Sequence, residues 1–152
     1  MSDIAIIKLE EKIDFTNSSI VEKTDCVPRW NQRDSFKSNH CIAMGWGRDE
    51  YDNKPRILQE VMLPMLDART CARFDSDHDW DVCFCAGYVK EIKQTFVGDS
   101  GGPLICPVEI NGGNDYKFVL IGIISSGYRR CPGFFTRVSY FENWINQTIN
   151  SD

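Results

Sequence analysis

Residues 98–104 read Gly-Asp-Ser-Gly-Gly-Pro-Leu, which places Ser100 between glycines on both sides. Glycine weakens strands and helices, and it is used where the backbone takes special dihedral angles or approaches another group closely. A nucleophilic serine needs such a setting, because its Oγ must be accessible and nearby N–H groups must point toward a developing oxyanion. The stretch therefore makes Ser100 a candidate nucleophile.

Residues 98–102 also satisfy the pattern Gly-x-Ser-x-Gly, the nucleophile elbow of the α/β-hydrolases. That fold requires a helix directly after the serine and a histidine further along the chain. Pro103 and a strand-like segment follow Ser100 instead, and no histidine occurs after it. Chain order therefore argues against the α/β-hydrolase interpretation.

The composition is that of one globular domain. The chain has 152 residues, of which 42% are hydrophobic and 26% are charged, and this balance is not that of a disordered chain. The formal net charge of −5 argues against nucleic acid as the main partner. No apolar run approaches the length of a membrane-spanning helix, so we expect no membrane partner.

The cysteine content indicates an oxidising compartment. Seven cysteines are many for a cytosolic protein of this size, and they lack the paired Cys-x₂-Cys blocks of a structural zinc site. Asn17-Ser18-Ser19 and Asn146-Gln147-Thr148 match the N-glycosylation pattern. The apolar patch Ile4–Ile7 is interrupted at once by Lys8, unlike a secretion signal. We therefore expect a secreted protein whose beginning is missing from this sequence.

Short apolar segments between turn clusters predict an antiparallel β-protein, either a barrel or a sandwich. A turn over residues 111–115 is expected to join two of these segments in a hairpin. Ser139 is expected to cap a C-terminal helix, with Glu142 completing a capping box, because large apolar residues then recur at helical spacing. We expect strands at residues 3–9, 40–46, 58–66, 104–108, 116–124 and 134–138.

Several segments resemble, in the family's order, the chymotrypsin/trypsin-like serine proteases. The serine stretch matches the nucleophile motif, and Cys41–Gly47 (Cys-Ile-Ala-Met-Gly-Trp-Gly) matches the strand that opens the second barrel. The other matching segments are Asp3–Leu9, Cys85–Gly87 and Gly133–Val138, so the resemblance covers essentially the whole chain. It implies an all-β fold: the second antiparallel β-barrel of the trypsin-like double-barrel fold with a C-terminal α-helix, the first barrel being largely absent.

The resemblance also divides the chain. It implies a single partial trypsin-like protease domain over residues 1–152. Within it, 1–25 correspond to a remnant of the first barrel, 26–39 to the connection between barrels, 40–138 to the second barrel, and 139–150 to the helix. We therefore expect residues 3–9 to lack their neighbours in a sheet.

Carried over position by position, the resemblance implies roles for four residues: two catalytic residues, an oxyanion donor and a zymogen-switch carboxylate. Ser100 is the nucleophile, and the backbone N–H groups of Gly98 and Ser100 form the oxyanion hole. Asp3 is the carboxylate that holds the catalytic histidine. Asp99 accepts the ammonium group of a new N-terminus after zymogen cleavage, because an unpaired buried carboxylate is costly.

The resemblance places a specificity pocket beside the serine. Gln94 stands at the base of this pocket, so the aspartate that gives a preference for arginine and lysine is missing. Gly127 and Gly133 fall at the wall positions, which predicts an open pocket with a neutral polar floor. Ser126 replaces the family's usual tryptophan, and the loop from Cys131 to Pro132 is shorter than usual.

Two disulfides are implied by the resemblance, Cys41–Cys106 and Cys71–Cys85. The second closes a loop of about 15 residues, which is worth roughly 3 kcal/mol in the chain-entropy model. Phe96 replaces the cysteine that normally pairs with the one at Cys131. Cys26 matches a cysteine that joins this half to the segment upstream. The pairing of Cys26, Cys83 and Cys131 stays open.

The acidic segment Asp75–Asp81 invites a metal interpretation. Its spacing begins like a calcium-binding EF-hand loop, but Trp80 takes the glycine position and Ala86 the bidentate glutamate position. A zinc site of His78, Cys83 and Cys85 would sacrifice the Cys71–Cys85 bridge. We therefore expect a solvated acidic loop, no metal and no cofactor.

The catalytic base is the missing part of this machinery. The family places its histidine upstream of the aspartate, whereas His40 and His78 both follow Asp3. We expect the C-terminal part of a secreted serine endopeptidase, acting on a polypeptide substrate or held by a protein inhibitor. Its partner would be the missing N-terminal half of the domain, and the chain as given would be inactive. The alternative is a non-catalytic homologue that acts as a binding or regulatory module.

Overall fold

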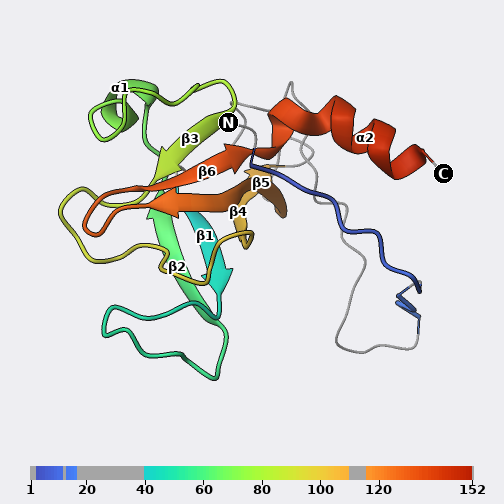
Figure 1. Cartoon of the computed structure of the whole chain (residues 1–152), viewed down its shortest axis with the longest axis horizontal. Helices are drawn as coiled ribbons and strands as arrows, with labels where there is room; N and C mark the ends of the chain where they lie inside the picture. The colour runs from blue at the N-terminus through green and yellow to red at the C-terminus, as the bar shows by residue number, and fades with distance from the viewer. Residues whose placement is uncertain (1–2, 12, 17–39, 110–115, 152) are drawn as a thin grey trace.

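The protein is represented by a computed structural model that describes residues 3–11, 13–16, 40–109 and 116–151 (Figure 1). Its main body is one six-stranded antiparallel sheet with the strand order β2-β1-β4-β5-β6-β3. The strands are β1 (His40–Gly45), β2 (Gln59–Pro64), β3 (Cys83–Ala86), β4 (Pro103–Glu109), β5 (Tyr116–Gly127) and β6 (Gly133–Arg137).

The two edge strands of this sheet meet just beyond the end of β2. An isolated bridge pairs Met65 with Ala86, the Leu66 N–H donates to the Cys85 carbonyl over 3.1 Å, and the Gly87 N–H donates to the Pro64 carbonyl over 2.9 Å. These bonds curl the sheet back toward its first strand, as in a small antiparallel barrel. The predicted fold class, one trypsin-like barrel with a C-terminal helix, is confirmed.

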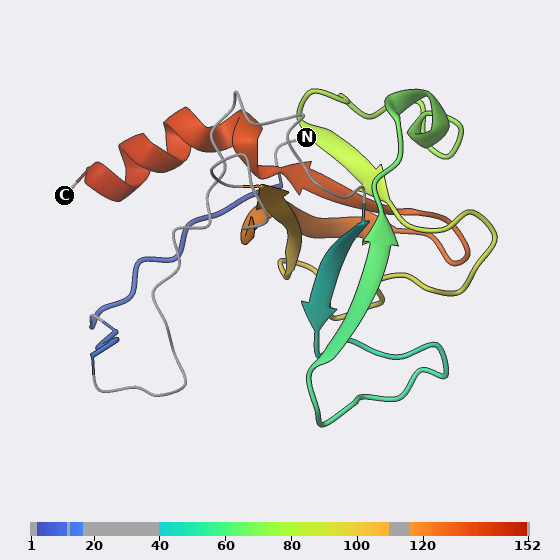
Figure 2. The same cartoon turned by 180° about the vertical axis from the view of Figure 1, so that it is seen from behind.

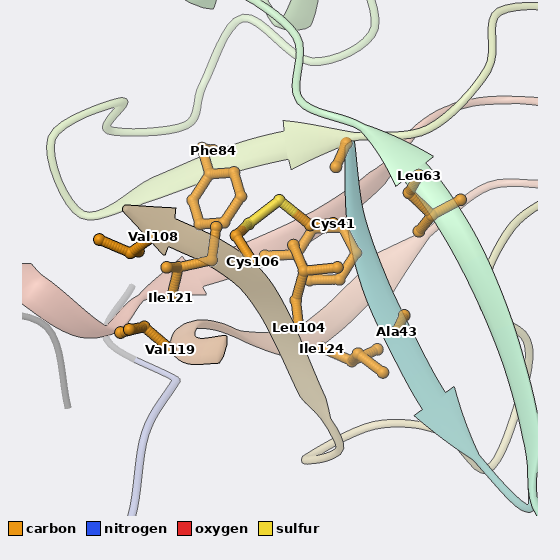
Figure 3. Packing of buried hydrophobic residues seen from close by; sticks show 12 residues of the cluster. Cys41, Ala43, Leu63, Phe84, Leu104, Cys106, Val108, Val119, Ile121 and Ile124 are labelled. Carbon is orange, nitrogen blue, oxygen red and sulfur yellow. A yellow bond between two sulfur atoms is a disulfide. The ribbon is translucent and has the colours of Figure 1, made fainter. Parts of the chain in front are cut away.

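The core lies inside the curled sheet, where alternate side chains of each strand point (Figure 3). Along β4, Leu104, Cys106 and Val108 are buried, while the residues between them are only partly covered. Such alternation is what a strand with one buried face requires. Fully burying a Leu, Val or Phe side chain is worth roughly 1.5–3 kcal/mol, so this cluster dominates the stability of the barrel. Its fully or nearly buried members include Cys41, Ala43, Leu63, Phe84, Val119, Ile121, Ile124 and Phe135.

The C-terminal α-helix begins further along the sequence than the capping pattern predicts. A 3-10 turn, η2 (Val138–Phe141), precedes α2 (Glu142–Asn150), and Phe141 occupies the N-cap of α2 without a side-chain hydrogen bond. The prediction that Ser139 caps this helix was wrong, because Ser139 is buried inside the 3-10 turn. Helix α2 buries Ile145 and extends away from the sheet (Figure 2).

Three local features differ from expectation. Residues 3–9 form no strand, because no strand of the described residues pairs with them, and most of them are exposed. The one-turn helix α1 (Ala68–Cys71) and the short strand β3 were not predicted. The predicted turn over residues 111–115 lies outside the described residues, although β4 and β5 on either side of it pair antiparallel. In the described part of the chain, no helix has both the length and the hydrophobicity needed to span a membrane.

Candidate active site

The loop that carries Ser100 is shaped by its glycines. Gly98 has a φ of 100° and Gly101 a φ of 83°, in the region that favours glycine over residues with a side chain. The Gly101 N–H donates to the Ile124 carbonyl over 2.8 Å, and the Ile124 N–H donates to the Gly102 carbonyl over 2.9 Å. The loop is thereby fastened to β5 with Ser100 exposed at its tip.

The carboxylate of Asp99 points beneath the loop. Its Oδ1 accepts from the Gly47 N–H over 2.8 Å and its Oδ2 from the Phe96 N–H over 2.9 Å. A Cβ built on Gly45 or on Gly47 would collide with this carboxylate, so the Gly-Trp-Gly pattern leaves the room that Asp99 occupies. Within the described residues, no lysine, arginine or histidine forms an ion pair with Asp99.

Asp3 lies against the end of β5, although residues 4–9 beyond it leave the sheet. The Ser125 Oγ donates to Asp3 Oδ2 over 2.6 Å, and the Thr136 Oγ1 donates to the Asp3 carbonyl over 2.8 Å. Ser125 follows Ile124, the residue to which the serine loop is fastened. The fold therefore brings Asp3 to the same end of β5 as the serine loop, across 122 residues of sequence.

A pocket of about 500 Å³ opens beside Ser100. Its walls are residues 94–98 on one side, residues 124–127 with Arg129 on another, and residues 48–50 with Asp52 on the third. A Cβ added at Gly127 would lie 3.5 Å from the Cα of Gly133, and one added at Gly133 would lie 3.3 Å from the Thr95 Oγ1. Gly127 and Gly133 therefore face each other, and the absence of their side chains widens this part of the structure.

A second pocket, also of about 500 Å³, adjoins the first and shares lining residues with it. Gln94, Thr95 and Phe96 line both pockets, and Asp99 lines only the second of them. Arg48, Asp49 and Glu50 also line both pockets, so the two cavities share residues of the segment that leads into the serine loop and of the segment that follows β1. Sequence reasoning found Gln94 but missed Thr95, Ser125 and the wall formed by residues 48–50 and Asp52, because nothing local to those residues marks them as neighbours of the serine.

His40 and His78 both lie on elements other than the serine loop. His40 begins β1, whereas the serine loop lies at the other end of that strand, where the Met44 carbonyl approaches Gly102; the rise of a strand puts these ends about 15 Å apart. The His78 ring stacks on Phe134 with a centroid separation of 4.7 Å, and its Nδ1 lies 3.1 Å from Asp75 Oδ2. His40 thus lies at the other end of β1 from the serine loop, and the contacts of His78 include Phe134 and Asp75.

Carboxylates of the acidic segment Asp75–Asp81 accept hydrogen bonds from N–H groups of the same segment. Asp75 Oδ1 accepts from the Asp77 N–H over 3.0 Å, and Asp79 Oδ1 accepts from the Asp81 N–H over 3.0 Å. The hydrogen bond from Asp77 and the contact with His78 lower the pKa of Asp75 below its ordinary value. Among the described residues, no three histidine, cysteine or carboxylate side chains gather as a metal ion requires.

The cysteines divide into two bridges and two thiols among the described residues. Cys41 is bonded to Cys106 and Cys71 to Cys85, the same two pairs that the resemblance implies, and the first bridge ties β1 to β4 within the core (Figure 3). Cys83 and Cys131 are free. Partial burial raises the pKa of the Cys83 thiol, which donates to the Asp79 carbonyl. Cys26 lies outside the described residues.

Comparison with known proteins agrees with this architecture. The family model described as Trypsin matches residues 1–145. A chymase of Cavia porcellus is 32% identical over 155 residues, covering 100% of this chain and 57% of the chymase. A venom protease of Bombus pensylvanicus is 35% identical over 154 residues, covering 94% of this chain and 58% of the venom protease. The chain belongs to the trypsin-like serine protease family, and it spans less than two thirds of the length of these relatives.

Proposed function

We propose that this chain carries the nucleophile, the oxyanion donors and the substrate pocket of a serine endopeptidase. One observation carries the proposal: Ser100 is exposed on a loop held by its glycines and by Asp99, directly beside a pocket of about 500 Å³. A peptide side chain seated in that pocket would present its carbonyl carbon to Ser100. Family membership supports the same activity.

The proposed chemistry has two halves. Ser100 Oγ attacks the scissile carbonyl, the N–H groups of Gly98 and Ser100 stabilise the oxyanion, and the amine leaves to give an acyl-enzyme that water then hydrolyses. Each oxyanion donor is typically worth about 3–4 kcal/mol of the barrier. Asp3 would accept a hydrogen bond from the imidazole N–H of a histidine that lies between Asp3 and Ser100. It would also stabilise the imidazolium that forms when this histidine takes the proton of Ser100.

We infer that this histidine is supplied by residues encoded upstream of Met1. The inference rests on the positions of His40 and His78, and on relatives that are longer than this chain. The same missing half would supply an ammonium group for Asp99. Asp99 lines the second pocket and has two N–H donors but no cation among the described residues, so its carboxylate is available to pair with a new N-terminal ammonium group.

The proposed setting is extracellular, where two disulfides persist. The partners of the whole protein would be polypeptide substrates and protein inhibitors. The alternative function is a non-catalytic homologue that only binds. It is favoured by Phe96 and Ser126, which replace a bridging cysteine and a tryptophan of the family pattern.

Labelling by a fluorophosphonate probe separates the two functions. We expect the protein with its upstream-encoded residues to label stoichiometrically and Ser100→Ala not to label. Residues 1–152 alone are expected to label about 10⁴-fold more slowly or worse, because the general base is missing. An upstream transcript with stop codons and no in-frame histidine, or an extended protein that fails to label, would establish the non-catalytic alternative. Rapid labelling of residues 1–152 would instead reveal another base.

A further inference from the structure

Gln94 is held at one end only. Its Oε1 accepts from the Arg130 N–H over 3.1 Å. Because only the oxygen of an amide can accept from an N–H group, this bond determines which end of the side chain is which. The Nε2 group therefore turns away from Arg130, and within the described residues it has no hydrogen-bond acceptor. Gln94 thus has two unused N–H donors on a side chain that lines both pockets, including the one beside Ser100.

The partner of Gln94 is built into a tight turn. Arg130 has a φ of 65°, which is uncommon for a residue with a side chain, and the Cys131 N–H donates to the Tyr128 carbonyl over 3.0 Å. The bond to Gln94 spans 36 residues of sequence and joins this turn to the segment leading into the serine loop. The orientation of the amide is therefore set by the fold before any ligand arrives.

Three of the charged residues around the pocket are already engaged with neighbours. Arg48 is occupied by Asp52, with its Nη1 3.1 Å from Asp52 Oδ2 and 2.9 Å from the Asp52 carbonyl. Asp49 Oδ1 is occupied by the N–H groups of Tyr51 and Asn53. The lining carries three carboxylates against two guanidinium groups. This balance disfavours an anionic ligand, while Gln94 itself carries no charge with which to hold a cationic one.

We propose that the pocket selects a P1 side chain ending in a neutral carbonyl, which means glutamine or asparagine, with Gln94 Nε2 donating to that carbonyl. This inference rests on the proposed function and names its substrate class. An aromatic P1 side chain would cover Nε2 without accepting its hydrogen bond, and a buried donor without a partner is costly. A lysine or arginine side chain would place its own N–H donors against those of Gln94 Nε2, with no acceptor for either group.

Binding tests this selection without any bond being cleaved. The protein carries Ser100→Ala and retains any upstream-encoded residues, and calorimetry compares four peptides that differ only in a C-terminal Gln, Glu, Arg or Phe. We expect the Gln peptide to bind about tenfold more tightly than each of the others, as one hydrogen bond of about 1.4 kcal/mol implies. Equal binding, no binding, or a preference for Arg or Phe would overturn the inference.

Gln94→Glu in the same background is the matched variant. It keeps an oxygen to accept from Arg130 and the length of the side chain, and it exchanges only the donating end for an accepting one. We expect the preference to pass from the Gln peptide to the Arg peptide. If Gln94 only braces the turn, the ranking of the four peptides stays the same in Gln94→Glu. The unsubstituted ranking remains decisive even if this variant does not fold.

The two proposals fail in distinguishable ways. Fluorophosphonate labelling of the protein with Ser100 intact reports the catalytic function and does not depend on the P1 side chain. Cleavage of matched substrates with P1 Gln, Arg or Phe then reports the selection. A protein that labels but prefers Arg or Phe retains the proposed function and loses this inference. A protein that binds the Gln peptide selectively but does not label retains the pocket and loses catalysis.

Discussion

The carboxylate of Asp99 contributes to holding the serine loop, beside the hydrogen bonds that join the loop to β5. Asp99 accepts from the Gly47 and Phe96 N–H groups, while its own carbonyl accepts from the Gly102 N–H over 2.8 Å. Asp99 therefore joins the end of β1 to both sides of the loop. Hydrogen bonds to a charged acceptor are stronger than those between neutral groups, so this residue contributes more to the loop than its exposed neighbour Ser100.

Asp99→Asn is expected to loosen the loop and to lower the free energy of unfolding by about 1–3 kcal/mol. An amide offers only one acceptor and turns an NH₂ group toward one of the two N–H donors, which leaves that donor without a partner. Urea unfolding at pH 7 measures the change. Asp52→Asn is the control: Asp52 pairs with Arg48 on the surface, and loss of an exposed pair costs at most about 1 kcal/mol. Equal effects of the two substitutions would contradict this account.

At the scale of single residues, the sequence predicts a structural role only where neighbouring residues in the sequence mark it. The glycines around Ser100 are informative because two of them adopt positive φ, and a run of glycines marks such a backbone directly. The Gln94–Arg130 and Asp3–Ser125 bonds span 36 and 122 residues. Nothing near those residues encodes their partners, so Asp3 could be assigned only through the family resemblance and the partner of Gln94 not at all.

At the scale of elements, the strands that carry the core were the predictable ones. Strands β1, β2, β4, β5 and β6 lie within two or three residues of their predicted ends, because each combines apolar residues with a flanking turn signal. Strand β3 has four residues and helix α1 one turn, which is too short for any periodicity to appear. Residues 3–9 have the sequence pattern of a strand, but no strand among the described residues pairs with them. Without a neighbouring strand they cannot form the backbone hydrogen bonds of a sheet.

Helix α1 shows how a short element depends on its cap. Asp67 is its N-cap, and Oδ1 and Oδ2 accept from the Thr70 N–H over 2.8 Å and from the Thr70 Oγ1 over 2.9 Å. Both bonds favour the ionised carboxylate, and they lower the pKa of Asp67 in the folded protein. A folded pKa below the unfolded one adds stability above the unfolded pKa, and this stability is lost as the pH falls through the folded pKa.

Asp67→Ala is therefore expected to lower the urea midpoint clearly at pH 7 and only slightly at pH 2. Asp67→Asn, which keeps an accepting oxygen at the cap, is expected to retain most of the stability at pH 7 and to respond less to pH. Unfolding curves of the three proteins at both pH values provide the measurement. A loss from Asp67→Ala that is the same at pH 2 as at pH 7 would show that the charge of Asp67 plays no part.

At the scale of the whole molecule, the described residues divide into a cross-linked barrel and an uncovered N-terminal segment (Figures 1 and 2). Both disulfides lie within residues 41–106. In the N-terminal segment Ile7 is 85% exposed, and Leu9 and Ile13 are more than half exposed. Side chains of this kind are normally buried. Together with the length of the relatives, their exposure supports the proposal that further protein covers this segment.

Amide hydrogen exchange distinguishes these two parts. In residues 1–152 alone, the amides of Val119–Ile121 in the middle of β5 are expected to exchange only through global opening, at least about a thousandfold more slowly than free peptide. The amides of Ile4–Leu9 have no backbone hydrogen bond among the described residues, so they are expected to exchange at nearly the free rate. If upstream-encoded residues complete the domain as proposed, their presence is expected to slow exchange in Ile4–Leu9 and to leave β5 nearly unchanged, because they would pair with this segment. Protection of Ile4–Leu9 equal to that of β5 in residues 1–152 alone would show that the segment already has a partner within this chain.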